Sequence, residues 1–212
     1  MEFSNPLGIE YRVVGDMEHL GQPARSVRGS RTFQTDSDDL WDALTNAERL
    51  PRWFLPISGE LKMGGRYQLD GNAGGKITRC DPPVALEVTW EYGGNVSWVI
   101  LRLEPDGDGT RLTLEHIMGQ DETSEDHWKK YGPGATGVGW DLGFLGLGMH
   151  LATGETIEQK ELYAWMATDP GKEFVRHCAR AWGDAHVASG EPAENALSIA
   201  ATTAAFYTGE GQ

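Results

Sequence analysis

Apolar and polar residues alternate with a period of two in several consecutive segments between residues 26 and 116, which predicts half-buried strands. The clearest is 86–92, where Leu86, Val88, Trp90 and Tyr92 alternate with Glu87, Thr89 and Glu91. Glycine-rich turns at 71–75, 93–95 and 106–109 separate the segments. Because the segments follow one another without intervening helices, we expect consecutive antiparallel strands.

Two short helices are expected between the first strand, 26–35, and the later strands. Asp36 or Ser37 is a suitable cap for the first helix. A second, brief helix is expected from Asn46, with Pro51 late in it.

The last ninety or so residues show helical periodicity. Residues 135–153 predict a long helix that is apolar nearly all round, so it must be covered on more than one side. Further helices are expected from Asp169 to about Ser189 and after Pro192. The last helix is rich in alanine, and we expect it to pack on a ridge of small residues formed by Gly139, Gly143 and Gly146.

The chain is thus expected to have three parts. Residues 1–25 would form an extended arm, 26–153 a sheet-and-helix domain, and 154–212 a helical C-terminal extension that packs on this domain or on a partner. A length of 212 residues suits one domain with such an appendage.

Charge and cysteine content narrow the classes of partner and compartment. The net charge of -14 repels phosphate backbones and anionic lipids, so neither nucleic acid nor a membrane is an expected partner. Only two cysteines occur, far apart, and the N-terminus lacks the pattern of a signal peptide; both favour a cytoplasmic location. The most apolar run, 134–152, contains Asp141 and His150, which indicates a buried helix and not a membrane span.

The sequence contains no strong metal, cofactor or nucleophile motif. His177, Asp184 and His186 lack the i, i+4 spacing of helical zinc ligands, and no Gly-x-Ser-x-Gly elbow is present. We therefore expect no metal and no cofactor. Asp141 is expected to pair with an arginine or to cap a backbone group.

Six short motifs occur in order along the chain: Trp41-Asp42-Ala43-Leu44-Thr45, Arg52-Trp53-Phe54, Gly64-Gly65-Arg66-Tyr67, Gly75-Lys76-Ile77, Leu86-Glu87-Val88-Thr89-Trp90 and Gly109-Thr110-Arg111-Leu112. In this order they resemble the domain homologous to the C-terminal part of the activator of the heat-shock-protein-90 ATPase. That family belongs to the START-like (SRPBCC), birch-pollen-allergen-like helix-grip superfamily. The resemblance covers about residues 27–152, and residues 155–212 depart from the minimal domain.

The resemblance implies an α+β helix-grip fold, in which a seven-stranded antiparallel sheet wraps around a long helix and leaves an internal cavity. It does not imply one function, because superfamily members include ligand-binding proteins, cyclases, hydrolases and a chaperone regulator.

Candidate site residues come from the aromatic and ionisable side chains expected on the concave face. His116 shares a strand face with Leu112 and Leu114, so it could contact a ligand or act as a general acid or base; alternatively it is a hydrogen-bonded or hydrated histidine at the rim. Asp70 is the second catalytic candidate. The predicted ligand-binding residues are Arg66, Tyr67, Trp90, Tyr92, Leu114, His116, Trp140 and Phe144. The alternative is that the aromatic residues fill the core.

Three functions remain open at this point. The first is non-enzymatic binding of a small hydrophobic or amphipathic molecule. The second is a cyclase or hydrolase that uses the same cavity, and the third is a chaperone-regulator-like interaction module. A homodimer formed through the C-terminal extension is compatible with each of them.

Overall fold

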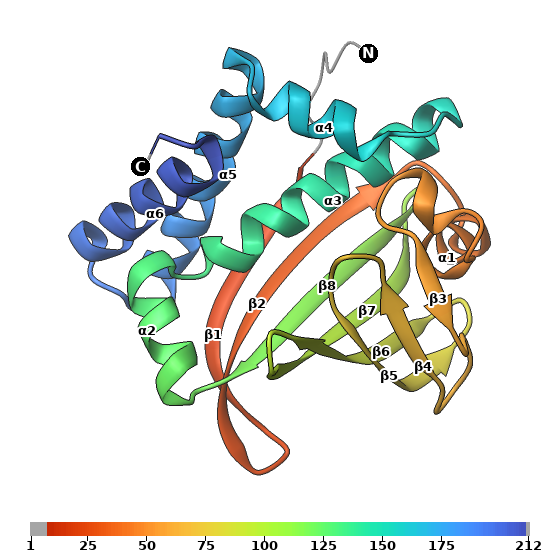
Figure 1. Cartoon of the computed structure of the whole chain (residues 1–212), viewed down its shortest axis with the longest axis horizontal. Helices are drawn as coiled ribbons and strands as arrows, with labels where there is room; N and C mark the ends of the chain where they lie inside the picture. Colours follow the sequence, from red (N-terminus) through yellow and green to blue (C-terminus); the bar gives the residue numbers. More distant parts are fainter. Residues whose placement is uncertain (1–7, 211–212) are drawn as a thin grey trace.

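A curved antiparallel sheet wraps around one long helix in the computed structural model, which describes residues 8–210 apart from the side chain of Thr123. Within this range eight strands lie in the order β1-β2-β8-β7-β6-β5-β4-β3. They are β1 (Tyr11–His19), β2 (Gln22–Phe33), β3 (Ile57–Gly59), β4 (Arg66–Leu69), β5 (Gly74–Asp81), β6 (Ala85–Tyr92), β7 (Asn95–Asp106) and β8 (Gly109–Gly119). The long helix α3 (Gly134–Thr153) crosses the concave face (Figure 1). The α+β helix-grip prediction is confirmed.

The N-terminal segment differs from the expected arm. Residues 11–19 form β1, which pairs with β2 from Tyr11 opposite Ser30 to His19 opposite Gln22. Leu20 and Gly21 turn the chain with positive φ angles, as a two-residue hairpin loop requires. The sheet therefore has eight strands, where the resemblance implied seven. The expected arm is wrong for 11–19, which form β1, and for 22–25, which belong to β2; its first seven residues lie outside the described range.

Two short helical elements lead from β2 to the later strands, as the sequence predicts. The first is α1 (Ser37–Thr45), whose first turn is capped by the Asp36 carboxylate, which accepts a hydrogen bond from the Asp39 backbone N–H at 2.8 Å. The second, expected from Asn46 with Pro51 late in it, is a single 3₁₀ turn, η1 (Leu50–Arg52), that begins at Leu50 instead. Pro51 lies in its first turn, where its missing N–H has no helical partner to lose.

Four further helices complete the chain: α2 (Glu122–Tyr131), α4 (Gln159–Met166), α5 (Asp169–Ala188) and α6 (Ala193–Thr208). Helix α5 packs on both α3 and β1, and α6 packs mainly on α5 (Figure 1). The long helix α3 is therefore covered by the sheet on one side and by α5 on another. This arrangement explains why α3 is apolar nearly all round.

The expected packing of the last helix on a glycine ridge of α3 is wrong in its details. A β-carbon at Gly146 would face the carbonyl oxygen of Trp53, at 2.7 Å, and Gly143 borders an internal cavity. Of the three ridge glycines, Gly139 meets α6, through the Tyr207 hydroxyl. The close approach of two helices occurs instead between α5 and α6, where a β-carbon at Gly183 would lie 2.8 Å from Cβ of Ala200.

A buried carboxylate joins β1, α3 and α5. Asp141 of α3 is fully buried and accepts hydrogen bonds from the Ile9 backbone N–H at 2.8 Å, from Arg12 Nη2 at 2.6 Å and from Trp182 Nε1 at 2.8 Å. The arginine and the backbone group expected as alternative partners of this residue are both present.

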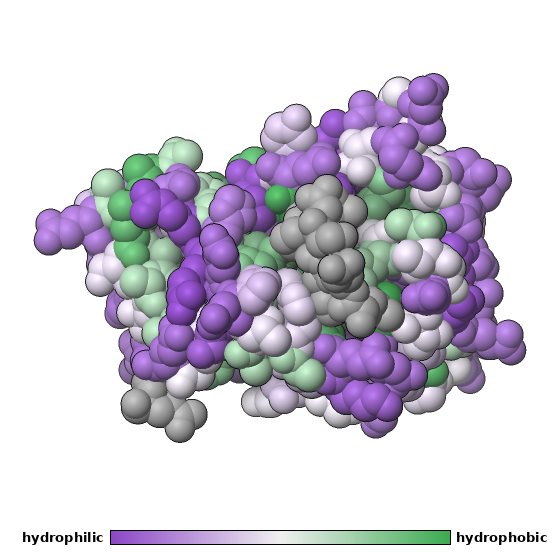
Figure 2. Space-filling model, turned by 90° about the horizontal axis from the view of Figure 1, so that it is seen from above, coloured by the Kyte–Doolittle hydropathy of each residue, from purple (hydrophilic) through white to green (hydrophobic). Residues whose placement is uncertain are grey.

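The surface seen from above carries many hydrophilic residues, and its hydrophobic areas are small and interrupted (Figure 2). Within residues 8–210, none of the helices combines the length and hydropathy needed to cross a bilayer. The apolar character of α3 is thus accounted for by its burial.

Candidate ligand-binding cavity

An apolar cavity of about 140 Å³, here called the inner cavity, lies between the sheet and α3. Helix α3 contributes Trp140, Gly143, Phe144 and Leu147 to its lining. The opposite wall consists of aliphatic side chains from the sheet, among them Leu86, Val88, Leu101, Leu112 and Leu114. Strand alternation places these residues on the concave face.

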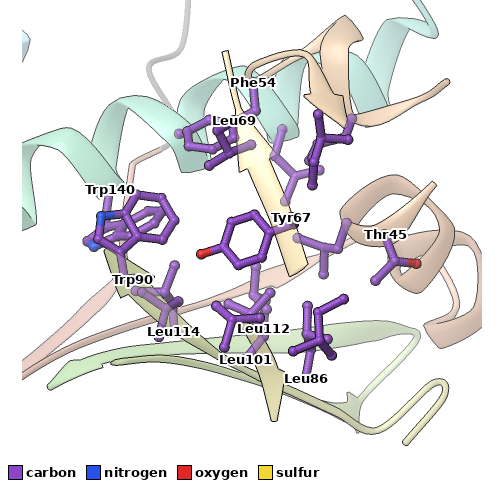
Figure 3. A pocket seen from close by; sticks show the side chains of 18 of the residues that line it. Thr45, Phe54, Tyr67, Leu69, Leu86, Trp90, Leu101, Leu112, Leu114 and Trp140 are labelled. Carbon is purple, nitrogen blue, oxygen red and sulfur yellow. The ribbon is translucent and has the colours of Figure 1, made fainter. Parts of the chain in front are cut away.

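Figure 3 shows how the labelled side chains are arranged around the inner cavity. Trp90 and Trp140 lie together at one end, Thr45 lies at the other, and Tyr67 stands between them. The Tyr67 hydroxyl donates a hydrogen bond to the Thr89 carbonyl oxygen at 2.8 Å. Burial raises the pKa of this hydroxyl well above its usual value, so Tyr67 stays a neutral phenol that is tied to the sheet.

A second, larger space of about 590 Å³, here called the outer cavity, lies at the Trp90–Trp140 end. It is bordered by the turn between β6 and β7, the end of β8, helix α2 and the start of α3. Tyr207 of α6 also lines it, so the C-terminal extension contributes to its wall. Its lining includes Asn95, Ser97, Thr136 and His116, so it is more polar than the inner cavity.

Three aromatic side chains, Phe54, Trp90 and Trp140, line both cavities and form their common wall. The ring centroids of Trp90 and Trp140 are 5.2 Å apart in an edge-to-face arrangement. Phe54 stacks on Trp140 with centroids 6.2 Å apart. These are ordinary geometries for aromatic pairs, so the wall is stabilised by contacts among its own members.

His116 joins this aromatic wall to β7 by a chain of hydrogen bonds. Trp140 Nε1–H donates to His116 Nδ1 at 3.2 Å, and His116 Nε2 lies 2.8 Å from Ser97 Oγ. Ser97 Oγ in turn donates to the Trp90 carbonyl oxygen at 3.1 Å. Since indole can only donate, Nδ1 must accept and the proton of a neutral imidazole must reside on Nε2.

Burial lowers the pKa of His116 to about 4. The side chain is therefore neutral at pH 7, and both of its ring nitrogens are engaged within the protein. A general acid or base needs a nitrogen within reach of the reacting proton. In this arrangement His116 positions Trp140, and it does not offer a free nitrogen to a bound molecule.

The buried imidazole predicts a specific dependence of stability on pH. Because the folded-state pKa of about 4 lies below the ordinary value of 6.5, the unfolded chain takes up the proton first as the pH falls. The free energy of unfolding should therefore decrease from pH 6.5 towards pH 4, by at most about 1.4 kcal/mol per pH unit from this group. Urea unfolding at several pH values, with wild type and His116→Gln, measures this contribution.

The Gln variant should show a shallower decrease over this interval. The exposed His177, replaced by glutamine in the same way, serves as control and should follow the wild-type profile. Parallel profiles for wild type and His116→Gln would show that His116 is not held neutral by burial.

Seven of the eight predicted ligand-binding residues line one of the two cavities, with the exposed Tyr92 at the rim of the outer one. Tyr67, Trp90, Leu114, Trp140 and Phe144 line the inner cavity, and Tyr92 and His116 line the outer one. Tyr92 is 61% exposed.

Arg66 and the catalytic candidate Asp70 lie outside both cavities. Arg66 is exposed and forms an ion pair with Glu91, with a closest N–O distance of 2.6 Å. Asp70 is also exposed. Because Tyr67 and Leu69 of β4 point inward, their neighbours Arg66 and Asp70 must point outward. Asp70 is therefore poorly placed for chemistry in either cavity.

Several lining residues were not selected from the sequence: Phe54, Ser97, Thr136, Trp128 and Tyr207. The hairpin at 106–109 sets the register of β7 against β8, with Val99 opposite His116. Ser97, two residues before Val99, then falls on the same face as His116. That signal could have identified Ser97. Trp128 and Tyr207 belong to helices whose position depends on tertiary packing, and no local pattern indicates their role.

Trp98 lies on the other face of the sheet. It packs with Ala24, Ile100 and Ile117 in a small second cluster, and its ring centroid lies 4.3 Å from that of His19. The aromatic residues are thus divided between two faces. This division lets the concave face keep a cavity.

The family model of the activator of Hsp90 ATPase homolog 1-like proteins matches residues 34–147. The chain belongs to this family. The match begins after β2 and ends within α3, so it includes every element that lines the inner cavity. A search of curated proteins finds no match to this chain.

Solved structures of other proteins show the same fold. The crystal structure of CalU16 from Micromonospora echinospora is 31% identical to this chain, covers 82% of it and 96% of CalU16, and superposes with a TM-score of 0.65. The solution structure of CalU16 is 29% identical over 99% of this chain and 100% of CalU16, with a TM-score of 0.60. That alignment includes the C-terminal helices.

A more distant relative extends the comparison of folds. EF2215 from Enterococcus faecalis, a conserved protein of unknown function, is 18% identical, covers 82% of this chain and 91% of its own, and has a TM-score of 0.56. At this identity the comparison concerns the fold alone.

Proposed function

We propose that this protein binds a small hydrophobic or amphipathic molecule in the inner cavity, without transforming it. The observation that supports the proposal is the cavity itself, whose lining from both α3 and the sheet is overwhelmingly apolar. Its volume of about 140 Å³ is close to the ~150 Å³ of an apolar protein cavity that stays dry and takes up benzene.

The polar groups of this cavity favour binding over chemistry. The Tyr67 hydroxyl is committed to the Thr89 carbonyl, and the pKa of Tyr67 is raised by burial. Asp70 lies outside the cavity, and His116 has both ring nitrogens engaged. A compact apolar group would gain about 1.5–3 kcal/mol from burial of its surface, with no polar group left unpaired.

Gly143 offers a way to test the proposal, because it lines the inner cavity on the α3 side. A β-carbon at this position would have its nearest neighbour 4.0 Å away, in Trp140 of the same helix. Gly143→Leu should therefore place its side chain in the cavity. We expect propylbenzene to bind wild type, as measured by calorimetry and by tryptophan fluorescence, and to bind Gly143→Leu at least about tenfold more weakly.

Gly143→Ala is the matched control, since a methyl group leaves most of the cavity free. It should bind propylbenzene nearly as wild type does. Absence of propylbenzene binding to wild type, or equal binding to Gly143→Leu, would overturn the proposal. Thermal unfolding of each variant verifies that it is folded.

The other two functions have weaker support. A cyclase or hydrolase would need a free acid or base beside the cavity, and neither candidate has that geometry. A chaperone-regulator-like role is suggested by the family description, which concerns homologues of an activator of the Hsp90 ATPase. Homodimer formation through the C-terminal helices and a cytoplasmic location stay predictions.

A further inference from the structure

We infer that the natural ligand has two parts: a compact apolar ring in the inner cavity and an uncharged hydrogen-bonding group in the outer cavity. This inference rests on the proposed function, because it concerns the same ligand. It adds the outer cavity as a second subsite and specifies the chemistry of the group that occupies it.

The two cavities are neighbours that share one aromatic wall. Phe54, Trp90 and Trp140 line both, so a ligand that spans them passes between these side chains. Trp140 is half-buried, and its indole N–H makes a single hydrogen bond of 3.2 Å to His116. Rotation of this indole therefore costs one hydrogen bond of modest net strength together with its ring contacts to Trp90 and Phe54, which the contacts of a bound ligand would replace.

The outer cavity offers uncharged donors and acceptors to a polar group. Asn95 and Ser97 line it from the β6–β7 hairpin, and Thr136 lines it from the first turns of α3. Among residues 8–210, the contact of the Thr136 hydroxyl is a weak one, 3.7 Å to the sulfur of Met118. Aromatic side chains from three helices, Trp128, Trp140 and Tyr207, provide apolar surface beside these groups.

The charges around the outer cavity disfavour an ionic group. Among the described residues that line it there is no carboxylate, so a cationic group would lack a counter-ion. Arg25 lines it but is already paired with Glu125, at 2.5 Å, and with Asp16, at 3.4 Å. Its guanidinium also lies 4.8 Å from the Trp128 ring centroid. An anionic group would have to compete with two carboxylates and with a net charge of -14.

Three probes that share a phenyl ring and a three-carbon chain test the inference: 3-phenylpropane-1,2-diol, 3-phenylpropionate and 3-phenylpropylammonium. The three probes are titrated at pH 8, because this pH lies above the range in which histidine usually titrates. We expect the neutral diol to bind at least about tenfold more tightly than either ion, because a charge that leaves water without a partner loses its hydration.

Nuclear Overhauser effects then locate the bound diol in wild type. Protons of the phenyl ring should contact the Leu114 methyl groups, and protons of the diol should contact the Thr136 methyl group. Contacts of both ends with Leu114 alone, or with neither residue, would overturn the two-part assignment.

A charge placed in the outer cavity provides the matched variant. Thr136→Glu should weaken 3-phenylpropionate and strengthen 3-phenylpropylammonium relative to the diol, while Thr136→Gln should keep the preference for the diol over both ions. Asn95→Asp is nearly isosteric at an exposed position and should change the affinities in the same direction by a smaller factor. Asn95→Asp replaces Thr136→Glu as the test if Thr136→Glu does not fold.

Propylbenzene, which has no polar group, distinguishes apolar binding in the inner cavity from recognition of a polar group in the outer cavity. If propylbenzene binds but the three probes bind equally, or the charged variants leave their relative affinities unchanged, this inference is wrong and the proposed function stands. If propylbenzene also fails to bind, the proposed function itself is wrong.

Discussion

Replacement of Asp141 by alanine is expected to lower the free energy of unfolding by about 3–5 kcal/mol. The substitution removes the acceptor of hydrogen bonds from Ile9, Arg12 and Trp182 and leaves the Arg12 side chain, only 9% exposed, without its counter-charge. An uncompensated buried charge is among the most destabilising changes in a folded protein. Urea unfolding followed by far-ultraviolet circular dichroism measures the loss.

Two controls distinguish this mechanism from a general effect of removing an aspartate. Asp126→Ala removes an exposed carboxylate that pairs with Lys129 at 3.7 Å, and it should change stability by less than about 0.5 kcal/mol. The double variant Arg12→Met/Asp141→Leu removes both charges and should recover the part of the loss that comes from the unpaired Arg12, while the Ile9 and Trp182 N–H groups still lack their acceptor. If Asp141→Ala is no more destabilising than Asp126→Ala, Asp141 does not join β1 and α5 to α3.

The second large effect is expected at Gly137, also on α3. A β-carbon there would lie 2.2 Å from Cε2 of Trp182 and 2.4 Å from its Nε1, the atom that donates to Asp141. Gly137→Ala must therefore displace the indole, and we expect it to destabilise the protein by about 2–3 kcal/mol.

Gly143→Ala, on the same helix, should have the opposite sign. The methyl group meets no atom closer than 4.0 Å, so the gain in helix propensity is expected to stabilise the protein by about 0.5–1 kcal/mol. Thermal and urea unfolding of the two variants side by side provide the comparison. Equal effects of the two substitutions would mean that α5 does not pack closely on Gly137 or that the inner cavity does not extend to Gly143.

The strands and the long helix could be predicted because their periodicity is local. Leu86, Val88 and Trp90 alternate with polar residues since one face of β6 meets the concave side, and no distant part of the chain is needed to see this. Asp36 caps α1 through its own side chain, which is also a local interaction.

β1 was missed because it is an edge strand with a weak pattern. Val14 is its one buried residue, whereas Tyr11 and Val13 are exposed, so no period of two marks an inner face. Its position depends on pairing with β2 and on the bond from Arg12 to Asp141, which is 129 residues away in sequence.

The candidate site was predicted in outline because alternation identifies the inner face of each strand. It identified Tyr67, Trp90, Leu114 and His116, and the same rule excludes Arg66 and Asp70. It could not show that the Trp140 indole occupies Nδ1 of His116, because that contact depends on how α3 is placed over β8. The role of His116 as a positioning residue therefore emerges only in three dimensions.

A crystal structure of the protein exposed to bromobenzene, with anomalous data collected at the bromine edge, would show directly whether the inner cavity binds an apolar ring. We expect a bromine peak inside the inner cavity, between Leu114 of β8 and Phe144 of α3, and loss of that peak in Gly143→Leu. A wild-type crystal with no peak in the cavity, or with one that persists unchanged in Gly143→Leu, would contradict the proposal that the inner cavity is a ligand-binding site.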